Sequence, residues 1–102
     1  MYEDYFCRRL TELRLEKGVS ARDMSLSLGQ SDSYINRIEN KKMLPSLTVF
    51  FYICDFFGIT PAEFFCEDEK LSLQTIQLIH DLKKLEPQKR EHVAAIVKDL
   101  SC

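Results

Sequence analysis

The hydrophobic residues near the start of the chain recur at intervals of three and four positions, which is the spacing of one face of a helix. Phe6, Leu10 and Leu13 form such a face and predict a helix from about Asp4 to Lys17. A glycine follows this stretch and two later ones, as expected of residues that end helices in a left-handed conformation. These helix-ending glycines are Gly18, Gly29 and Gly58.

Two short helices joined by a three-residue turn are predicted next. Ser20 can cap the first of them, which runs from about Ala21 to Leu28. Ser31 can cap the second, which reaches about Asn40, because a serine oxygen accepts a hydrogen bond from a free amide of the first turn. The hydrophobic residues that face inward from this pair are Met24, Leu28, Ile35 and Ile38.

The following helix, Leu47 to Phe57, is capped by Ser46 and is hydrophobic almost all round. A helix of that kind belongs at the centre of a core. Phe64 and Phe65 are expected to close this core from a fifth helix. The fifth helix opens with a cap, a proline at its first position and a reciprocal acid, which are Thr60, Pro61 and Glu63.

The rest of the chain predicts a helical hairpin. The acidic stretch Glu67 to Glu69 is the candidate linker, and Pro87 separates two helices, because proline suits the first turn of a new helix. The predicted fold is all-α, with a five-helix domain over residues 1–66 and the two-helix hairpin over residues 67–102. The inner stripes of the hairpin are Ile76, Ile79 and Leu82, then Val93, Ile96, Val97 and Leu100.

Composition predicts a soluble, cytoplasmic chain, since 45% of residues are hydrophobic, 29% are charged, and no leader or run of membrane-spanning length is present. The net charge is −2, with 8 basic against 9 acidic residues up to residue 66 and 6 against 7 beyond it. Proteins that bind DNA neutralise its phosphates with Lys and Arg. Any positive face must therefore be local.

Candidate catalytic chemistry is sparse. His80 and His92 lie on separate predicted helices with no ligand at metal spacing, and no nucleophile with its base, carboxylate pair or phosphate loop assembles. We therefore expect no enzyme activity, no cofactor and no metal. The cysteines are scattered, without a pair at metal or redox spacing: Cys7, Cys54, Cys66 and Cys102.

From about Phe6 to Phe65 the chain resembles the lambda and 434 repressor and Cro family, often called the XRE family. The resemblance implies a five-helix DNA-binding domain whose third helix enters the major groove. It is carried by Leu10, Leu13, Arg14, Gly18 and Ser20, by Gly29, Ser31, Ile35, Ile38, Glu39 and Asn40, and by Pro45, Ile53, Gly58 and Ile59.

Base-reading positions of the family correspond to Asp32, Ser33 and Arg37, and Tyr34 is also expected to face outward. Arg37 can bind guanine through two hydrogen bonds, Asp32 can accept from the amino group of cytosine, and Ser33 can donate or accept. The alternative is that these are ordinary solvated side chains. The resemblance further implies phosphate contacts by Asn40, Lys41 and Lys42, and we expect Arg22 and Ser31 to contribute to them.

In the family, the positions of Arg14 and Glu39 form an ion pair that joins the first and third helices. Two positions depart from the family pattern. Ala21 replaces a glutamine that clamps the third helix and the DNA backbone, and Lys41 replaces a glycine. Asp32 would also repel phosphates unless it met a base donor or a neighbouring cation.

The resemblance implies a transcriptional regulator, a repressor that binds double-stranded DNA as a homodimer at half-sites about 34 Å apart. The hairpin is expected to supply the dimer contacts, because it has too little interior to stand alone, or else to pack on its own chain. The alternative function is a protein-interaction module that binds a partner regulator through an acidic surface bearing Tyr34.

Overall fold

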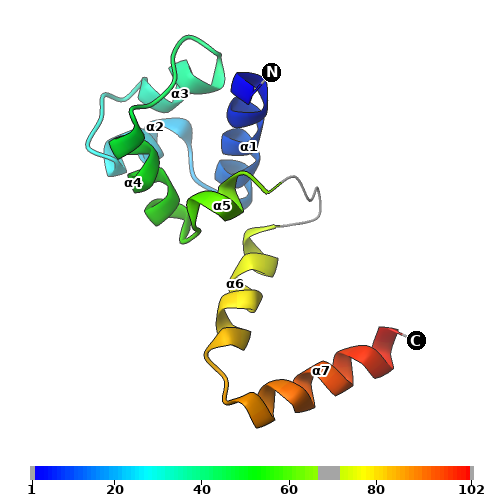
Figure 1. The fold of residues 1–102 in the computed structure, drawn as a ribbon. Helices are drawn as coiled ribbons and strands as arrows, with labels where there is room; N and C mark the ends of the chain where they lie inside the picture. Colours follow the sequence, from blue (N-terminus) through cyan, green and yellow to red (C-terminus); the bar gives the residue numbers. More distant parts are fainter. Residues whose placement is uncertain (1, 67–71, 102) are drawn as a thin grey trace.

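A computed structural model describes residues 2–66 and 72–101 of the chain, and the ordered elements in these two ranges are all helices (Figure 1). The all-α prediction is confirmed. The helices are α1 (Tyr2–Lys17), α2 (Ala21–Ser27), α3 (Tyr34–Glu39), α4 (Leu47–Phe57), α5 (Pro61–Phe64), α6 (Leu73–Lys83) and α7 (Pro87–Ser101).

Side-chain caps begin most of these helices where the sequence predicts them. Ser20 accepts a hydrogen bond from the Asp23 amide, and Ser46 accepts one from the Val49 amide. The predicted capping box at Thr60 is complete in both directions. Each cap supplies a partner for an amide that the first helical turn leaves free.

The third helix differs from its prediction at the start. It begins at Tyr34, its N-cap is Ser33, and this serine makes no side-chain capping bond. Ser31 accepts the Tyr34 amide through its backbone carbonyl at 3.1 Å instead. The segment between α2 and α3 therefore continues as a turn up to residue 33, and Ser31 is not the cap of α3.

One hydrophobic core joins α1, α2, α3, α4 and α5. Ile35, Ile38 and Ile53 are fully buried in it, as is Phe64. Phe65 was expected to close the core beside Phe64, but its side chain is 45% exposed and lies at the rim. The reason is that α5 ends at Phe64, so the two consecutive side chains point in different directions.

Arg9 is a buried charged residue that fastens α5 to α1. Its Nε donates to the carbonyl of Phe64 at 2.9 Å, and its second guanidinium nitrogen donates to the carbonyl of Glu63 at 3.0 Å. The last carbonyls of a helix have no partner within the helix. Arg9 supplies that partner from a distant part of the sequence.

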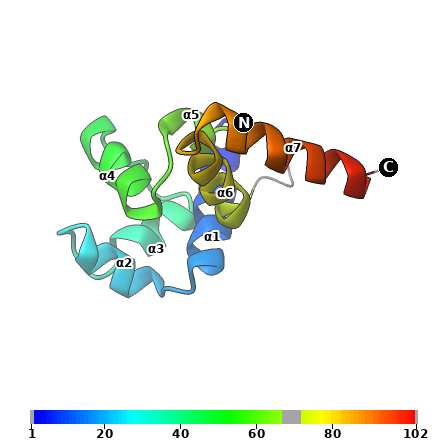
Figure 2. The same ribbon diagram turned by 90° about the horizontal axis from the view of Figure 1, so that it is seen from below.

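The tail helices divide between two environments. α6 packs against α1, and Ile76 of α6 is only 1% exposed within the core (Figure 2). α7 leaves α6 at a wide angle and projects away from the other helices (Figure 1). The two helices and the break at Pro87 are as expected. Of the two outcomes expected for the hairpin, α6 follows the second, because it packs on the helical domain of its own chain. The candidate linker Glu67 to Glu69 lies outside the described residues.

Candidate nucleic-acid interface

Ser25 fixes the position of α3 relative to α2. Its hydroxyl donates to the carbonyl of Ala21 at 2.7 Å and accepts from the amide of Ile35 at 2.9 Å. The side chain is fully buried, so both bonds are protected from water. The sequence reasoning missed this residue, although a serine at an inward position of a short helix, one after Met24, was a signal for it.

Arg14 and Glu39 form a two-pronged ion pair between α1 and α3. The Nε of Arg14 lies 2.7 Å from one carboxylate oxygen of Glu39, and a terminal nitrogen lies 2.9 Å from the other. The remaining terminal nitrogen donates to the carbonyl of Val19 at 3.0 Å. The side chains are 14% and 11% exposed, and the hydrogen bond to Glu39 raises the pKa of Arg14. This pair holds the end of α3 against α1.

The outward face of α3 presents Asn36 and Arg37, both exposed. Asp32 is exposed in the preceding turn and Ser33 is half-buried there. The side-chain amide of Asn40 donates to both the backbone and side-chain oxygens of Asn36, at 2.8 and 2.9 Å. Arg37 is thus the long side chain of α3 that can extend freely from this face.

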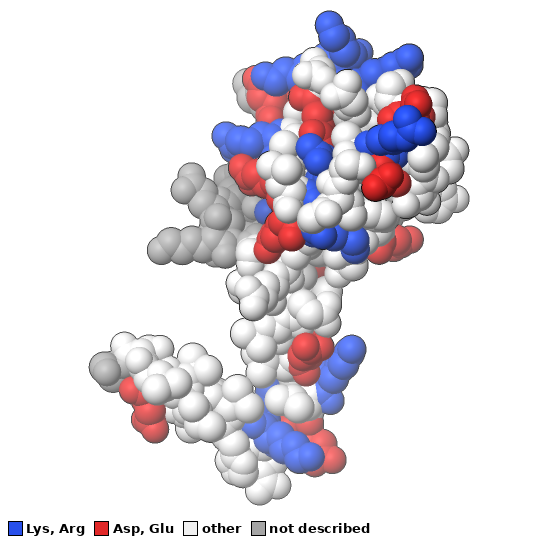
Figure 3. Space-filling view, turned by 180° about the vertical axis from the view of Figure 1, so that it is seen from behind, with Lys and Arg blue, Asp and Glu red and all other residues white. Residues whose placement is uncertain are grey.

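Two of the cations expected to contact phosphate are paired with carboxylates. Arg22 lies 3.5 Å from Asp32, and the amine of Lys41 lies 2.7 Å from Asp4. The second pairing raises the pKa of Lys41 and lowers the pKa of Asp4. Figure 3 shows basic and acidic side chains interspersed over this end of the molecule, with no continuous basic surface on the face in view.

Arg37 and Lys42 differ from these two residues. Neither makes an ion pair within residues 2–66 and 72–101, and both are exposed. Lys41, between α3 and Lys42, has a backbone φ of 61°, in the left-handed region that a glycine would occupy without strain. This conformation turns the chain after α3 and leaves Lys42 beside the end of the helix.

The geometry of α2, the turn and α3 agrees with what the comparisons with known proteins found. The sequence model of a helix-turn-helix family matches residues 10–64, which is more than half of the chain. The chain belongs to this helix-turn-helix family. The resemblance to XRE-family regulators is thereby confirmed, and the first five helices carry a DNA-binding domain of the transcriptional-regulator type.

Two similar curated proteins are helix-turn-helix transcriptional regulators. The HTH-type transcriptional regulator PuuR of Escherichia coli (strain K12) is 33% identical over 63 residues, which cover 62% of this chain and 34% of PuuR. PuuR of Shigella flexneri gives the same values. The chain therefore spans about a third of the length of these relatives. No solved structure matches the chain.

The structure corrects one predicted base-reading residue of the helix-turn-helix domain. Tyr34 is only 9% exposed and packs in the hydrophobic core, and its burial raises the pKa of its hydroxyl. Because α3 begins at Tyr34, the ring of this first helical residue turns inward, next to Ile35. Tyr34 is therefore a core residue, and neither base reading nor a partner surface can depend on its ring.

The residues predicted to form dimer contacts differ in how far the structure buries them. Ile76 belongs to the core of the helix-turn-helix domain, so in this structure it is not available to a second chain. Ile79 and Leu82 are half-buried on α6. On α7, Val93 is half-buried, and the exposed members of the set are Ile96, Val97 and Leu100.

Other kinds of site find little support in the part of the chain that is described. No helix there is long and hydrophobic enough to span a membrane. No three His, Cys, Asp or Glu side chains of those residues come together as a metal site would require. Cys54 is buried, and its burial raises the pKa of its thiol to about 11, so it is a core thiol and a poor nucleophile.

Proposed function

We propose that this chain is a transcriptional repressor that binds a pseudo-palindromic operator as a homodimer, with residues 1–66 as the DNA-binding domain and residues 67–102 as the dimerisation element. The observation that carries the proposal is the rigid presentation of α3. Ser25 and the Arg14–Glu39 pair hold this helix from two sides, while Arg37 remains exposed and without an ion pair among the described residues. A helix fixed in this way can enter the major groove at little entropic cost.

Arg37 is the proposed principal reader of bases. A guanidinium forms two parallel hydrogen bonds with the major-groove edge of guanine, and such a contact is worth about 1–3 kcal/mol against a wrong base. Asp32 and Ser33 read from the turn before α3. Arg22 lies 3.5 Å from Asp32 in the free protein, so its positive charge can accompany Asp32 toward the phosphates.

Phosphate contacts are assigned to Lys42 and Lys41 after α3, to Asn40 at its end, and to Ser31 and Arg22 before it. Lys42 is ready for such a contact, whereas Lys41 must exchange Asp4 for a phosphate. That exchange makes binding depend on a close fit of the domain to the duplex. It also lowers the affinity for DNA in general, because fewer free cations release fewer counterions.

A selection of genomic DNA fragments with the purified full chain tests the proposal. We expect Arg37→Ala to lose discrimination among fragments, with a loss of about 1–3 kcal/mol at one position of the site. Lys42→Ala should weaken binding to all fragments alike and reduce the salt slope by about 1. Lys83→Ala removes the same charge from an exposed position of α6 that is outside the proposed DNA and dimer contacts, and it is the matched control. If no DNA is retained even at low salt, the proposed DNA binding is wrong.

The charge pattern supports a second candidate, a helix-turn-helix scaffold that binds a partner regulator. Arg22 and Lys41 are both paired with carboxylates, and the chain has a net charge of −2. A protein partner does not require a continuous basic face, whereas DNA affinity depends on one. Absence of salt-dependent DNA retention would favour this second candidate.

A further inference from the structure

A groove lies between the start of α1, the connection from α3 to α4, and the start of α4. Its volume is about 360 Å³, which is the size of a small-molecule site. Phe6 and Phe50 form its floor, since each is only 7% exposed. The hydrophobic residues around this floor are Tyr2, Leu44, Pro45, Leu47 and Phe65.

The aromatic rings of this groove contact one another without stacking face to face. The ring centroid of Phe50 lies 5.7 Å from that of Phe6 and 5.5 Å from that of Phe65, with the ring planes at 55° and 45°. Tyr2 lies one helical turn before Phe6 on α1. Tyr2 and Phe65 are 72% and 45% exposed, so a ligand can reach their rings. The face of an aromatic ring is partly negative and attracts an organic cation.

The charge at this groove has one sign. Glu3 is exposed, and among the described residues that line the groove it is the one with a charged side chain. Lys41 belongs to the adjoining connection, but its amine lies 2.7 Å from the carboxylate of Asp4. A carboxylate beside accessible aromatic rings favours a cation over an anion.

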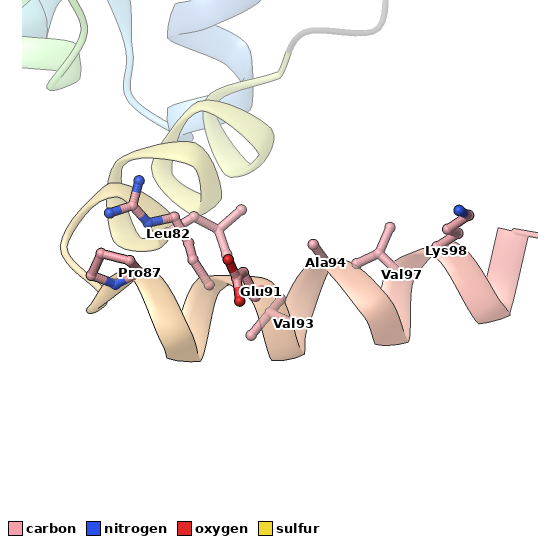
Figure 4. Close-up of a pocket in the computed structure, with 8 residues that line it drawn as sticks. Leu82, Pro87, Glu91, Val93, Ala94, Val97 and Lys98 are labelled. Carbon is pink, nitrogen blue, oxygen red and sulfur yellow. The ribbon is translucent and has the colours of Figure 1, made fainter.

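The groove in the corner between α6 and α7 has a different chemistry (Figure 4). Its volume is about 700 Å³, and Leu82 and Pro87 lie at its closed end. The charged residues that line it are Arg90, Glu91 and Lys98, and no aromatic residue is among its described lining residues. This second groove therefore has both signs of charge and no ring to attract a cation.

We propose that the groove between α1 and α4 binds a small organic cation with a hydrophobic body. The body lies over Phe6 and Phe50, and the cationic group lies beside Glu3 and the ring of Tyr2. The occupant is a free small molecule, because the volume corresponds to about one turn of a helix some 10 Å wide. That is too little to bury an interface with another protein.

Occupancy of the groove affects the contacts with DNA, and this step rests on the proposed function. The wall residue Leu44 lies two positions after Lys42, in the connection that also carries Lys41. A ligand that holds this wall against α1 therefore favours the arrangement of the free chain, in which Lys41 is paired with Asp4. Because the phosphate contact requires Lys41 to leave Asp4, the cation weakens DNA binding.

An NMR titration of the full chain, followed through its backbone amides, tests the site with benzyltrimethylammonium. We expect shifts at the residues that line the α1–α4 groove, with a dissociation constant of about 1 mM. Phenylacetate, an anion of similar size, should bind about tenfold more weakly at the same ionic strength.

Glu3→Gln should weaken binding of the cation about threefold and leave binding of uncharged benzyl alcohol unchanged. Glu91→Gln removes the same charge from the α6–α7 groove, so it is the matched control and should bind the cation as the wild type does. Circular dichroism shows whether each variant keeps its helices.

The site is overturned if phenylacetate binds as tightly as the cation, if Glu3→Gln leaves the affinity for the cation unchanged, or if the shifts occur at the α6–α7 groove. Lining amides that shift with protein concentration in place of cation concentration would overturn it as well, because a second copy would then occupy the groove.

Fluorescence anisotropy measures the effect on DNA separately. A saturating concentration of the cation should lower the affinity for a selected fragment about fivefold, compared with sodium chloride at the same ionic strength. A chain that binds the cation but no DNA removes only the proposed function. A chain that binds DNA but no cation removes the site, and an unchanged DNA affinity with the cation bound removes the regulatory step.

Discussion

Single residues decide how firmly the third helix is held. Arg14 and Glu39 are far apart in the sequence, and most of their surface is removed from water. Burying both charges costs free energy, but each charge is balanced by the other. Arg14 also donates a hydrogen bond to the carbonyl of Val19. Their contribution is to position α3, because the pair connects the end of this helix to α1.

Removing one member of this pair should be severe. We expect Glu39→Ala to lower the free energy of unfolding by about 3 kcal/mol, because Arg14 would remain desolvated without a counter-charge. Urea unfolding followed by circular dichroism measures the loss. Glu12→Ala, which breaks the exposed contact with Arg8 on α1, is the matched control and should cost about 0.5 kcal/mol or less. Equal losses in both variants would contradict the positioning role.

At the scale of elements, the main result is the docking of α6. Ile76 enters the core beside α1, and the carboxylate of Glu16 on α1 accepts the amide of Leu73 at 2.9 Å. His80 lies 3.0 Å from a carboxylate oxygen of Glu63 on α5. These contacts make α6 a sixth helix of the core, whereas none of the residues of α7 is buried.

The docking of α6 predicts a large cost for truncating its buried residue. Ile76→Ala should lower the free energy of unfolding by about 3 kcal/mol through the lost burial and the cavity that remains. Leu78→Ala, at a position that is 57% exposed on the same helix, should cost about 0.5 kcal/mol. Chemical denaturation of the two variants provides the comparison. A small and equal effect would mean that α6 is not docked in solution.

Glu63 links α5 to α6 and makes stability depend on pH. Burial acts to raise the pKa of Glu63, but hydrogen bonds from the Thr60 amide and from His80 lower it by more. The pKa of Glu63 therefore lies below its ordinary value of 4.5. The ionised Glu63 therefore stabilises the folded chain at pH values above 4.5. This stabilisation is lost as the pH falls through the lower pKa that Glu63 has in the folded state. Urea unfolding between about pH 5 and pH 3 should show a steeper loss for the wild type than for Glu63→Gln. Identical pH profiles would exclude this contribution.

For the whole molecule, one end carries the DNA-binding helix and the other carries the free helix. In the proposed homodimer, two copies of α3 would contact one duplex at half-sites about 34 Å apart. Val97→Glu puts a charge in the hydrophobic stripe, so it should abolish dimerisation. We expect about tenfold or greater loss of affinity for the full operator and little change for a single half-site, measured by fluorescence anisotropy. Equal losses for both DNAs would contradict cooperative binding through the tail.

Local sequence was sufficient for most of the helices and their ends. Caps, prolines and glycines act on the residues next to them, so Ser46, Thr60 and Pro87 could be interpreted without knowing the fold. Periodic hydrophobic positions likewise predicted the core residues Ile35 and Ile38. The start of α3 was misjudged, because a serine's backbone carbonyl, not its side chain, closes the turn there.

Tertiary structure decided which side chains remain available for function. Tyr34 and Ile76 have the residue types of a contact surface, but the core takes both, and only the packing of distant helices determines this. The pairing of Lys41 with Asp4 and of Arg22 with Asp32 also depends on residues brought together by folding. Sequence by itself determined the helices and a hydrophobic tail, because caps and helical periodicity are local, and the resemblance to the XRE family implied that the helical domain binds DNA. The free surfaces of α3 and α7 were decided by the fold, because burial and charge pairing depend on contacts between residues far apart in the chain.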